Sequence, residues 1–216
     1  MADPGLNKLL NWAVRNSAQS TNGEDAPAEG AAPAGRGLDA DALRALMGGP
    51  SDADRMKDAM TAIQSPQVDL DNKLIAFDNF EQLVEGIDNA NNMENLALWV
   101  PLVEQLDNTV SELRCMAAWC ISTAVQNNIQ AQGRALALGI VSKLVTLGLN
   151  DEQVATRKKA ITALSSEVRN YQPGMDELLK HLPKEHQPSS ETVDATDMDA
   201  VDVLINKLRE EVAKPR

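Results

Sequence analysis

The sequence predicts an all-α fold built from stacked helical repeats, and two observations carry that prediction. First, residues 114–127 return 43 positions later as residues 157–170, and a weaker copy stands 41 positions upstream. The small and apolar positions kept in the two stronger copies are Ala117, Ile121, Val125, Ala160, Leu164 and Val168. Second, 43% of the residues are hydrophobic but only 3% are aromatic, so modest aliphatic side chains must form the core. Such a core suits helices that pack closely against one another.

A helical period of about 40–47 residues is typical of armadillo and HEAT-type repeats. We therefore expect an all-α, armadillo/HEAT-like right-handed α-solenoid with a flexible N-terminal segment. Solenoids of this kind present long concave faces that bind other proteins. The repeat thus predicts a binding scaffold, without indicating what it binds.

The N-terminal third divides into three parts. Residues 1–18 form an amphipathic segment, with leucines at helical spacing from Leu6 and Trp12 close by. Residues 19–37 are rich in Gly, Pro and Ala, the composition of a flexible linker. Residues 38–68 contain two expected capping helices, at 39–47 and 51–64, the first of which stops at Gly48-Gly49-Pro50.

The repeats are expected over residues 69–182. Helices are predicted at 70–86, 94–107, 110–127, 130–148 with a break near Gly139, 152–170 and 174–181. Pro101 either ends or kinks its helix or lies in a first turn. Residues 183–216 form a polar loop and a terminal amphipathic helix at about 197–212, which is a candidate cap for the end of the solenoid.

Charge and composition exclude several classes of partner. The formal net charge of −12 argues against a nucleic-acid-binding surface. Arg157, Lys158 and Lys159 form a basic cluster, interpreted as a solvated helix face, with recognition as the alternative. No membrane span or signal peptide is evident, and Cys115 and Cys120 are expected to be small buried residues in a reducing compartment. We therefore expect a cytoplasmic protein that binds neither membrane nor nucleic acid.

The sequence carries no motif for catalysis. His181 and His186 lie in or beside a polar loop without a nearby cysteine, which is a poor pattern for zinc. No P-loop and no Gly-x-Ser-x-Gly setting occurs. We expect no enzyme activity, no cofactor and no metal.

Polar residues cluster where successive repeat helices end. The three clusters are Asp88, Asn89, Ala90, Asn91 and Asn92; Gln126, Asn127 and Asn128; and Arg169, Asn170 and Tyr171. One asparagine in a cluster can serve as a C-cap, because Asn tolerates the left-handed conformation. Capping does not explain three or more polar groups at equivalent places, so we interpret the clusters as a partner-binding row. Ala90, an alanine among amides, indicates close approach of a partner surface. We therefore expect Ala90→Arg to abolish partner binding while leaving thermal stability nearly unchanged.

Three segments are similar to one known family: LDNKLIAFDNFEQLVEGIDNANNMENLALW (70–99), ELRCMAAWCISTAVQNN (112–128) and RKKAITALSSEVRNYQPGM (157–175). They resemble the fungal members of the armadillo-type nucleotide exchange factors for heat shock protein 70. The opening LNKLLNWAVRNS and the pattern ALMGGPSDADRMKDAM also resemble that family. The likeness extends from Leu6 to about Met175.

The resemblance implies a cochaperone that wraps one lobe of the nucleotide-binding domain of heat shock protein 70. Straining that lobe lets ADP leave, ATP enter and client protein be released, while the factor itself binds no nucleotide. It also implies that the N-terminal segment, through Leu9, Leu10, Trp12 and Val14, enters the client groove of the chaperone's substrate-binding domain.

One departure and one alternative accompany this resemblance. The longer family members have a further basic repeat, where this chain has a polar loop and a terminal helix. The alternative function is an armadillo-type adaptor that holds a linear peptide with repeated Trp and Asn. Trp119 has no counterpart in the next repeat, where Thr162 stands, which disfavours the adaptor. A monomer is expected.

Overall fold

The computed structural model describes residues 50–214, and residues from Asp52 onward form one compact unit. Within the described range the chain is helical and contains no strand. The predictions for residues 1–18, 19–37 and 39–47 lie outside the described residues.

Ten α-helices and one short 3-10 helix make up the described part of the chain. They are α3 (Asp52–Gln64), α4 (Leu70–Val84), α5 (Ile87–Asn92), α6 (Trp99–Glu104), η1 (Gln105–Asp107), α7 (Ser111–Val125), α8 (Ile129–Ala137), α9 (Ile140–Asn150), α10 (Val154–Val168), α11 (Gln172–His181) and α12 (Met198–Ala213).

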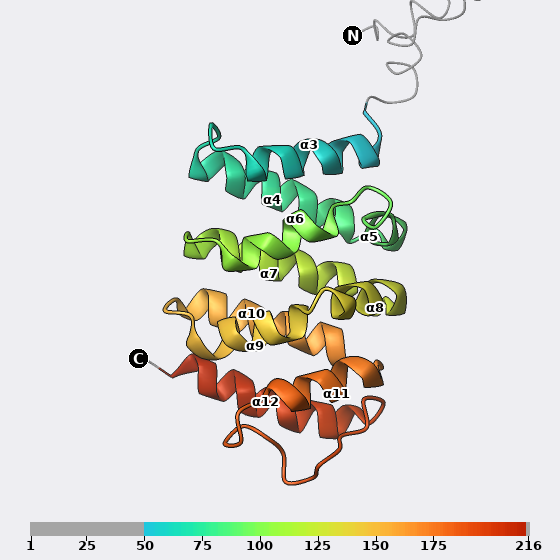
Figure 1. The fold of residues 1–216 in the computed structure, drawn as a ribbon, viewed down its shortest axis with the longest axis vertical. Coiled ribbons are helices and arrows are strands. Elements are labelled where there is room, and N and C mark those ends of the chain that lie inside the picture. Colours follow the sequence, from blue (N-terminus) through green and yellow to red (C-terminus); the bar gives the residue numbers. More distant parts are fainter. Residues whose placement is uncertain (1–49, 215–216) are drawn as a thin grey trace, which may run out of the picture. The chain divides into compact units, whose positions relative to one another are not determined.

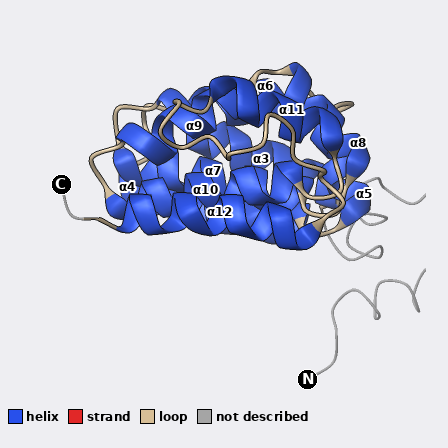
Figure 2. Ribbon diagram, turned by 90° about the horizontal axis from the view of Figure 1, so that it is seen from below, coloured by secondary structure: helices blue, strands red, loops and turns tan. Residues whose placement is uncertain are grey.

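The helices stack in successive layers from α3 to α12 (Figure 1). The long helix α7 packs between α4 and α10, and hydrogen bonds join equivalent levels of these neighbouring helices. Thr123 donates to Glu81 Oε1 at 2.6 Å, and the hydroxyls of Ser122 and Ser166 lie 3.0 Å apart. Seen along the stack, α6, α9 and α11 lie on the side opposite α12 (Figure 2). The predicted α-solenoid is confirmed.

The core follows the repeat. Each of the six small and apolar positions kept between the two stronger copies, from Ala117 to Val168, is 0% exposed. Gly139 has φ of 70° and separates α8 from α9, as the predicted break requires. Helix ends carry local caps: the carboxylates of Asp69 and Asp197 accept hydrogen bonds from the backbone N–H groups of Asn72 and Ala200.

The helix predicted at 94–107 is wrong in its first part. Residues 93–97 form a turn, and Ala97 adopts the left-handed conformation with φ of 54°. The Leu98 N–H reaches back to the Met93 carbonyl across this turn at 2.9 Å, which closes it. Helix α6 begins only at Trp99, so Pro101 lies in a first turn, where its missing N–H costs no helical hydrogen bond.

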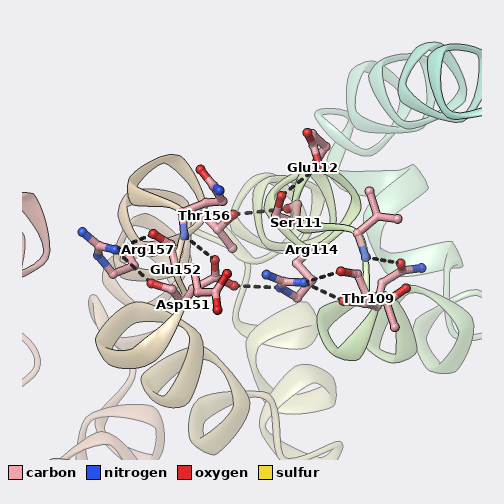
Figure 3. A network of polar contacts seen from close by, with 11 residues as sticks. Thr109, Ser111, Glu112, Arg114, Asp151, Glu152, Thr156 and Arg157 are labelled. Carbon is pink, nitrogen blue, oxygen red and sulfur yellow. Dashed lines mark hydrogen bonds and ion pairs between the residues drawn. The ribbon is translucent and has the colours of Figure 1, made fainter. Parts of the chain in front are cut away.

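The interpretation of Arg157 as part of a solvated helix face is also wrong. Its side chain is buried, 1% exposed, while Lys158 is exposed and Lys159 half-buried. The guanidinium donates to the carbonyls of Asp151 and Glu152 at the end of α9 (Figure 3). The guanidinium also donates to the backbone carbonyls of Val212 and Lys214 at the end of α12, at 3.1 Å each.

Arg114 occupies the equivalent place one repeat earlier. Its guanidinium donates to the carbonyls of Asn108 and Thr109 and forms an ion pair of 2.7 Å with Asp151 of the next repeat (Figure 3). Each arginine therefore holds the end of the preceding helix and a group from the layer that follows. For Arg157 the following layer is the C-terminal end of α12.

Helix α12 runs antiparallel to α10. Arg157, near the start of α10, contacts the C-terminal end of α12, whereas Arg169, just after α10, pairs with Asp202 near the start of α12. Its buried side chains, Val201, Leu204, Ile205, Leu208 and Val212, cover the last repeat. The helix thus packs as the cap that its amphipathic pattern favours, in the direction opposite to α4, α7 and α10.

Candidate functional site

The three polar clusters lie along one edge of the stack. At this edge α4, α7 and α10 end and the chain reverses into α5, α8 and α11. Helix α8 packs against both α5 and α11, so the three short helices follow one another down one side (Figure 1). We call this edge, which comprises residues 87–92, 126–129 and 169–171, the edge row.

The first cluster forms the short helix α5, and its side chains differ in exposure. Asp88 is exposed, and Asn91 and Asn92 are half-buried. Asn89 is turned inward: its amide donates to the Leu83 carbonyl at 2.9 Å and to Asp52 at 3.2 Å. Ala90 is 1% exposed, so its methyl group offers almost no surface to a partner, and the close approach predicted at this position stays a prediction. Its methyl group faces the core because α5 lays this side against the long helices.

The second cluster divides between solvent and a helix cap. Gln126 and Asn127 are exposed, and Asn127 has φ of 53°. Asn128 is 4% exposed and caps α8, accepting from Ala131 N–H at 3.2 Å. Asn128 is therefore part of the scaffold, contrary to its prediction as a contact residue.

The third cluster is held mainly by the C-terminal segment. Arg169 is half-buried, pairs with Asp202 and donates to the Ser165 hydroxyl at 3.1 Å. Asn170 is exposed, with φ of 56°, and its N–H donates to the Ala195 carbonyl. Tyr171 is half-buried. The left-handed Asn127 and Asn170 have the conformation that the C-cap alternative requires.

The sequence reasoning missed two exposed isoleucines on this edge. Ile87 and Ile129 are the first residues of α5 and α8 and are 57% and 68% exposed. A groove of about 290 Å³ lies between these two helices, lined by Ala90, Asn91, Gln130, Ala131, Gly133 and Arg134 among others. The 42-residue spacing of Ile87 and Ile129 is the sequence signal that could have identified them.

A buried acid lies beneath the third cluster. Glu167, near the end of α10, is 0% exposed, and neither carboxyl oxygen has a hydrogen-bond partner. Burial raises its pKa to about 9, so the side chain is a neutral acid at neutral pH. The pKa of Tyr171 is raised as well, first by burial and then by its proximity to Glu167.

Other chemistry is limited in the described part of the chain. Between residues 50 and 214, no group of three His, Cys, Asp or Glu side chains is placed to hold a metal ion. Burial raises the pKa of the Cys120 thiol well above its usual value, which disfavours a nucleophilic thiolate. Cys115 is half-buried, less enclosed than the sequence indicated. No described helix is long and apolar enough to span a bilayer.

Comparison with known proteins identifies the family of this chain. A model described as "Nucleotide exchange factor Fes1" matches residues 6–93, and one described as "SIL1/FES1/HPBP1 C-terminal domain" matches residues 89–182. A relative from Gibberella zeae, described as Hsp70 nucleotide exchange factor FES1, is 52% identical over 99% of this chain and 100% of its own length. The chain belongs to the Fes1 family.

Other members of the Fes1 family differ in length. A relative from Coccidioides immitis with the same description is 49% identical, over 96% of this chain and 98% of its own. The Saccharomyces cerevisiae relative is 39% identical over 81% of this chain but only 59% of its own length. An engineered protein with a crystal structure matches the fold, with a TM-score of 0.50 at 18% identity over 80% of this chain and 70% of that chain.

Proposed function

We propose that this member of the Fes1 family is a cochaperone that exchanges nucleotide on cytoplasmic heat shock protein 70. The observation that carries the proposal is the 52% identity, over 99% of this chain and all of the relative, to a protein described as an Hsp70 nucleotide exchange factor. The partner is its nucleotide-binding domain, and the factor acts as a monomer. It is not an enzyme, since it alters the partner's conformation and transforms no substrate itself.

The physical requirement for exchange is differential binding. A factor speeds ADP release only if it binds the open form of the nucleotide-binding domain more tightly than the closed form. The same coupling requires bound ADP to weaken the factor's affinity by an equal factor. A solenoid suits this task, because its continuous core fixes the spacing of contact residues and resists adapting to the closed form.

The edge row is the proposed contact surface. Asp88, Gln126, Asn127 and Asn170 are exposed there and can bond a partner's backbone, while Ile87 and Ile129 offer apolar area beside them. Asn91, Asn92 and Tyr171 contribute from half-buried positions. Asn89, Asn128 and Arg169 act indirectly, through the hydrogen bonds that shape this edge.

The decisive measurement is release of labelled ADP from heat shock protein 70 at substoichiometric amounts of the factor. Ile129→Arg should slow release strongly, because it places a charge in the proposed contact without disturbing the core. Val154→Arg is the matched control, since Val154 is 38% exposed and begins α10, at the opposite end of that helix from the edge row. Equal activity of the two variants would contradict the proposed surface, and no acceleration by the unaltered protein would contradict the function.

The burial of Ala90 changes what its substitution can report. Ala90→Arg is still expected to abolish chaperone binding, but it must also displace α5 or fill the groove beside it. Thermal stability should therefore fall, contrary to the sequence-based expectation that it stays unchanged. The exposed Ile87 and Ile129 are cleaner probes of the same surface.

A second module is proposed at the N-terminus. Leu9, Leu10, Trp12 and Val14 would occupy the client groove of the chaperone's substrate-binding domain. A protein that starts at Asp39 should then speed ADP release from the chaperone as well as the full chain does. The chaperone should, however, release its client less completely. Substituting Leu9, Leu10 and Trp12 with serine should have the same effect. Equal loss of both activities would contradict the two-module proposal.

A further inference from the structure

Glu167, which the proposed contact surface does not include, lies where α8, α10 and α11 meet. Gln132 of α8 donates to the carbonyls of Ser166, Glu167 and Arg169, at 3.0, 3.0 and 3.1 Å. This single amide therefore ties α8 to the last turn of α10. Gln132 is itself 1% exposed, so the contact is shielded from water.

Helix α11 closes the junction from the other side. A Cβ atom on Gly174 would lie 2.9 Å from the Glu167 carbonyl oxygen and 3.5 Å from its Cγ, so α11 approaches α10 too closely for a side chain at this position. The Tyr171 ring would lie 3.0 Å from the same Cβ position, and its hydroxyl would lie 3.5 Å from a Cβ on Gly133. The tyrosine thus spans α8 and α11 beside the buried acid.

The acid has no compensating charge at this junction. Burial alone raises the pKa of Glu167, Tyr171 is a neighbour whose own pKa Glu167 raises, and Gln132, Gly133 and Gly174 carry no charge. Arg169 is turned toward Ser165 and Asp202. At this level of α7, Ser122 contacts the neighbouring Ser166. One repeat earlier, the position of Glu167 is held by Ala124, which is 1% exposed.

We propose that Glu167 is a proton-dependent latch, in which the neutral acid lets α11 close against α8 and α10, and each opening of this junction releases one proton. An ionised carboxylate at this place would be buried without a partner, which is a costly arrangement. The closed junction therefore requires the protonated side chain. Once α11 lifts away, water reaches the carboxyl group and it ionises.

The latch responds near neutral pH, well below the value at which the closed form loses its proton. The closed side chain has its pKa raised to about 9, whereas a solvated one has the usual 4.5. Between these limits the open form binds one proton fewer than the closed form, so its population rises about tenfold per pH unit. Acidification therefore tightens the junction and alkalinisation loosens it. Because Asn170 and Tyr171 belong to the edge row, the latch determines how firmly the part of the edge row beside α11 is held in place.

Native-state hydrogen exchange of the α11 amides, at pH values between about 5.5 and 8, tests the latch. After correction for intrinsic base catalysis, the opening constant of the full-length protein should rise about tenfold per pH unit. In Glu167→Gln, an uncharged variant of the same shape, it should not depend on pH. Asp176→Asn, at an exposed position of α11, is the matched control and should keep the full slope.

Two results of the hydrogen-exchange experiment would overturn the latch. One is an opening constant in the unaltered protein that does not change with pH. The other is a Glu167→Gln protein that keeps the full slope, because another group would then release the proton. If Glu167→Gln fails to fold, carboxyl carbon NMR of the unaltered protein decides the matter. A Glu resonance should titrate near 9, and its absence would refute the proposal.

Discussion

Arg157→Met should weaken the fold at its C-terminal end. The guanidinium is 1% exposed and donates to four backbone carbonyls, two at the end of α9 and two at the end of α12. A hydrogen bond from a charged donor contributes about 1.5–3 kcal/mol. The cost of burying the charge offsets part of that sum, which leaves a net loss of about 3–5 kcal/mol on substitution. Met fills similar space but leaves the carbonyls unpaired.

Urea unfolding followed by helical circular dichroism measures this loss. The midpoint should fall, and the melting temperature should drop by about 2–4 °C per kcal/mol for a unit of this size. If α12 detaches before the rest unfolds, the slope of the transition should fall as well, because less surface is then exposed in the main step. Lys158→Met removes the same charge from an exposed neighbour and should change stability by less than about 0.5 kcal/mol. Equal midpoints for the two variants would refute the assigned role.

Two further predictions concern the core and the backbone. Ile121→Ala should destabilise the protein by about 2–5 kcal/mol in the same urea assay, because Ile121 is 0% exposed in the repeat core. Ile75→Ala, at a position 56% exposed, should change it by less than about 0.5 kcal/mol, and a similar effect of both would contradict the core assignment. Ala97→Gly should stabilise the fold by up to about 1 kcal/mol, since φ of 54° strains alanine but not glycine. A lower melting temperature for this variant would show that the turn tolerates alanine without strain.

The repeat period was enough to predict the stacked helices and their buried faces. Ala117, Ile121 and Val125 recur with helical spacing and again after 43 residues, and both periodicities report the same packed stripe. Local signals predicted the break at Gly139 and the start of α12 after Asp197, because caps and left-handed positions depend on neighbours along the chain. The alignment of the polar clusters along one edge was also predictable, because they stand at equivalent positions of successive repeats.

Individual contacts across the stack were not predictable in the same way. Arg157 looked like part of a basic surface, but α12 returns antiparallel from 55 residues further on and buries it. Ala90 looked like a contact residue, because α5 has only six residues and too short a pattern to show which side faces inward. Asn128 and Arg169 are bound to α8 and to α12, so their amide and guanidinium groups serve the scaffold.

The sequence by itself determined the all-α class, the repeat core and the membership of the Fes1 family, since each depends on patterns that recur along the chain. Only the tertiary structure decided which polar groups are used internally and which remain available. Glu167 illustrates the reason. Its place on the buried stripe could be counted from the repeat, with Ala124 as its counterpart, but its lack of a partner depends on how α8, α10 and α11 meet. Burial and hydrogen bonding of a polar group are set by residues far apart in the chain, which a local pattern does not encode.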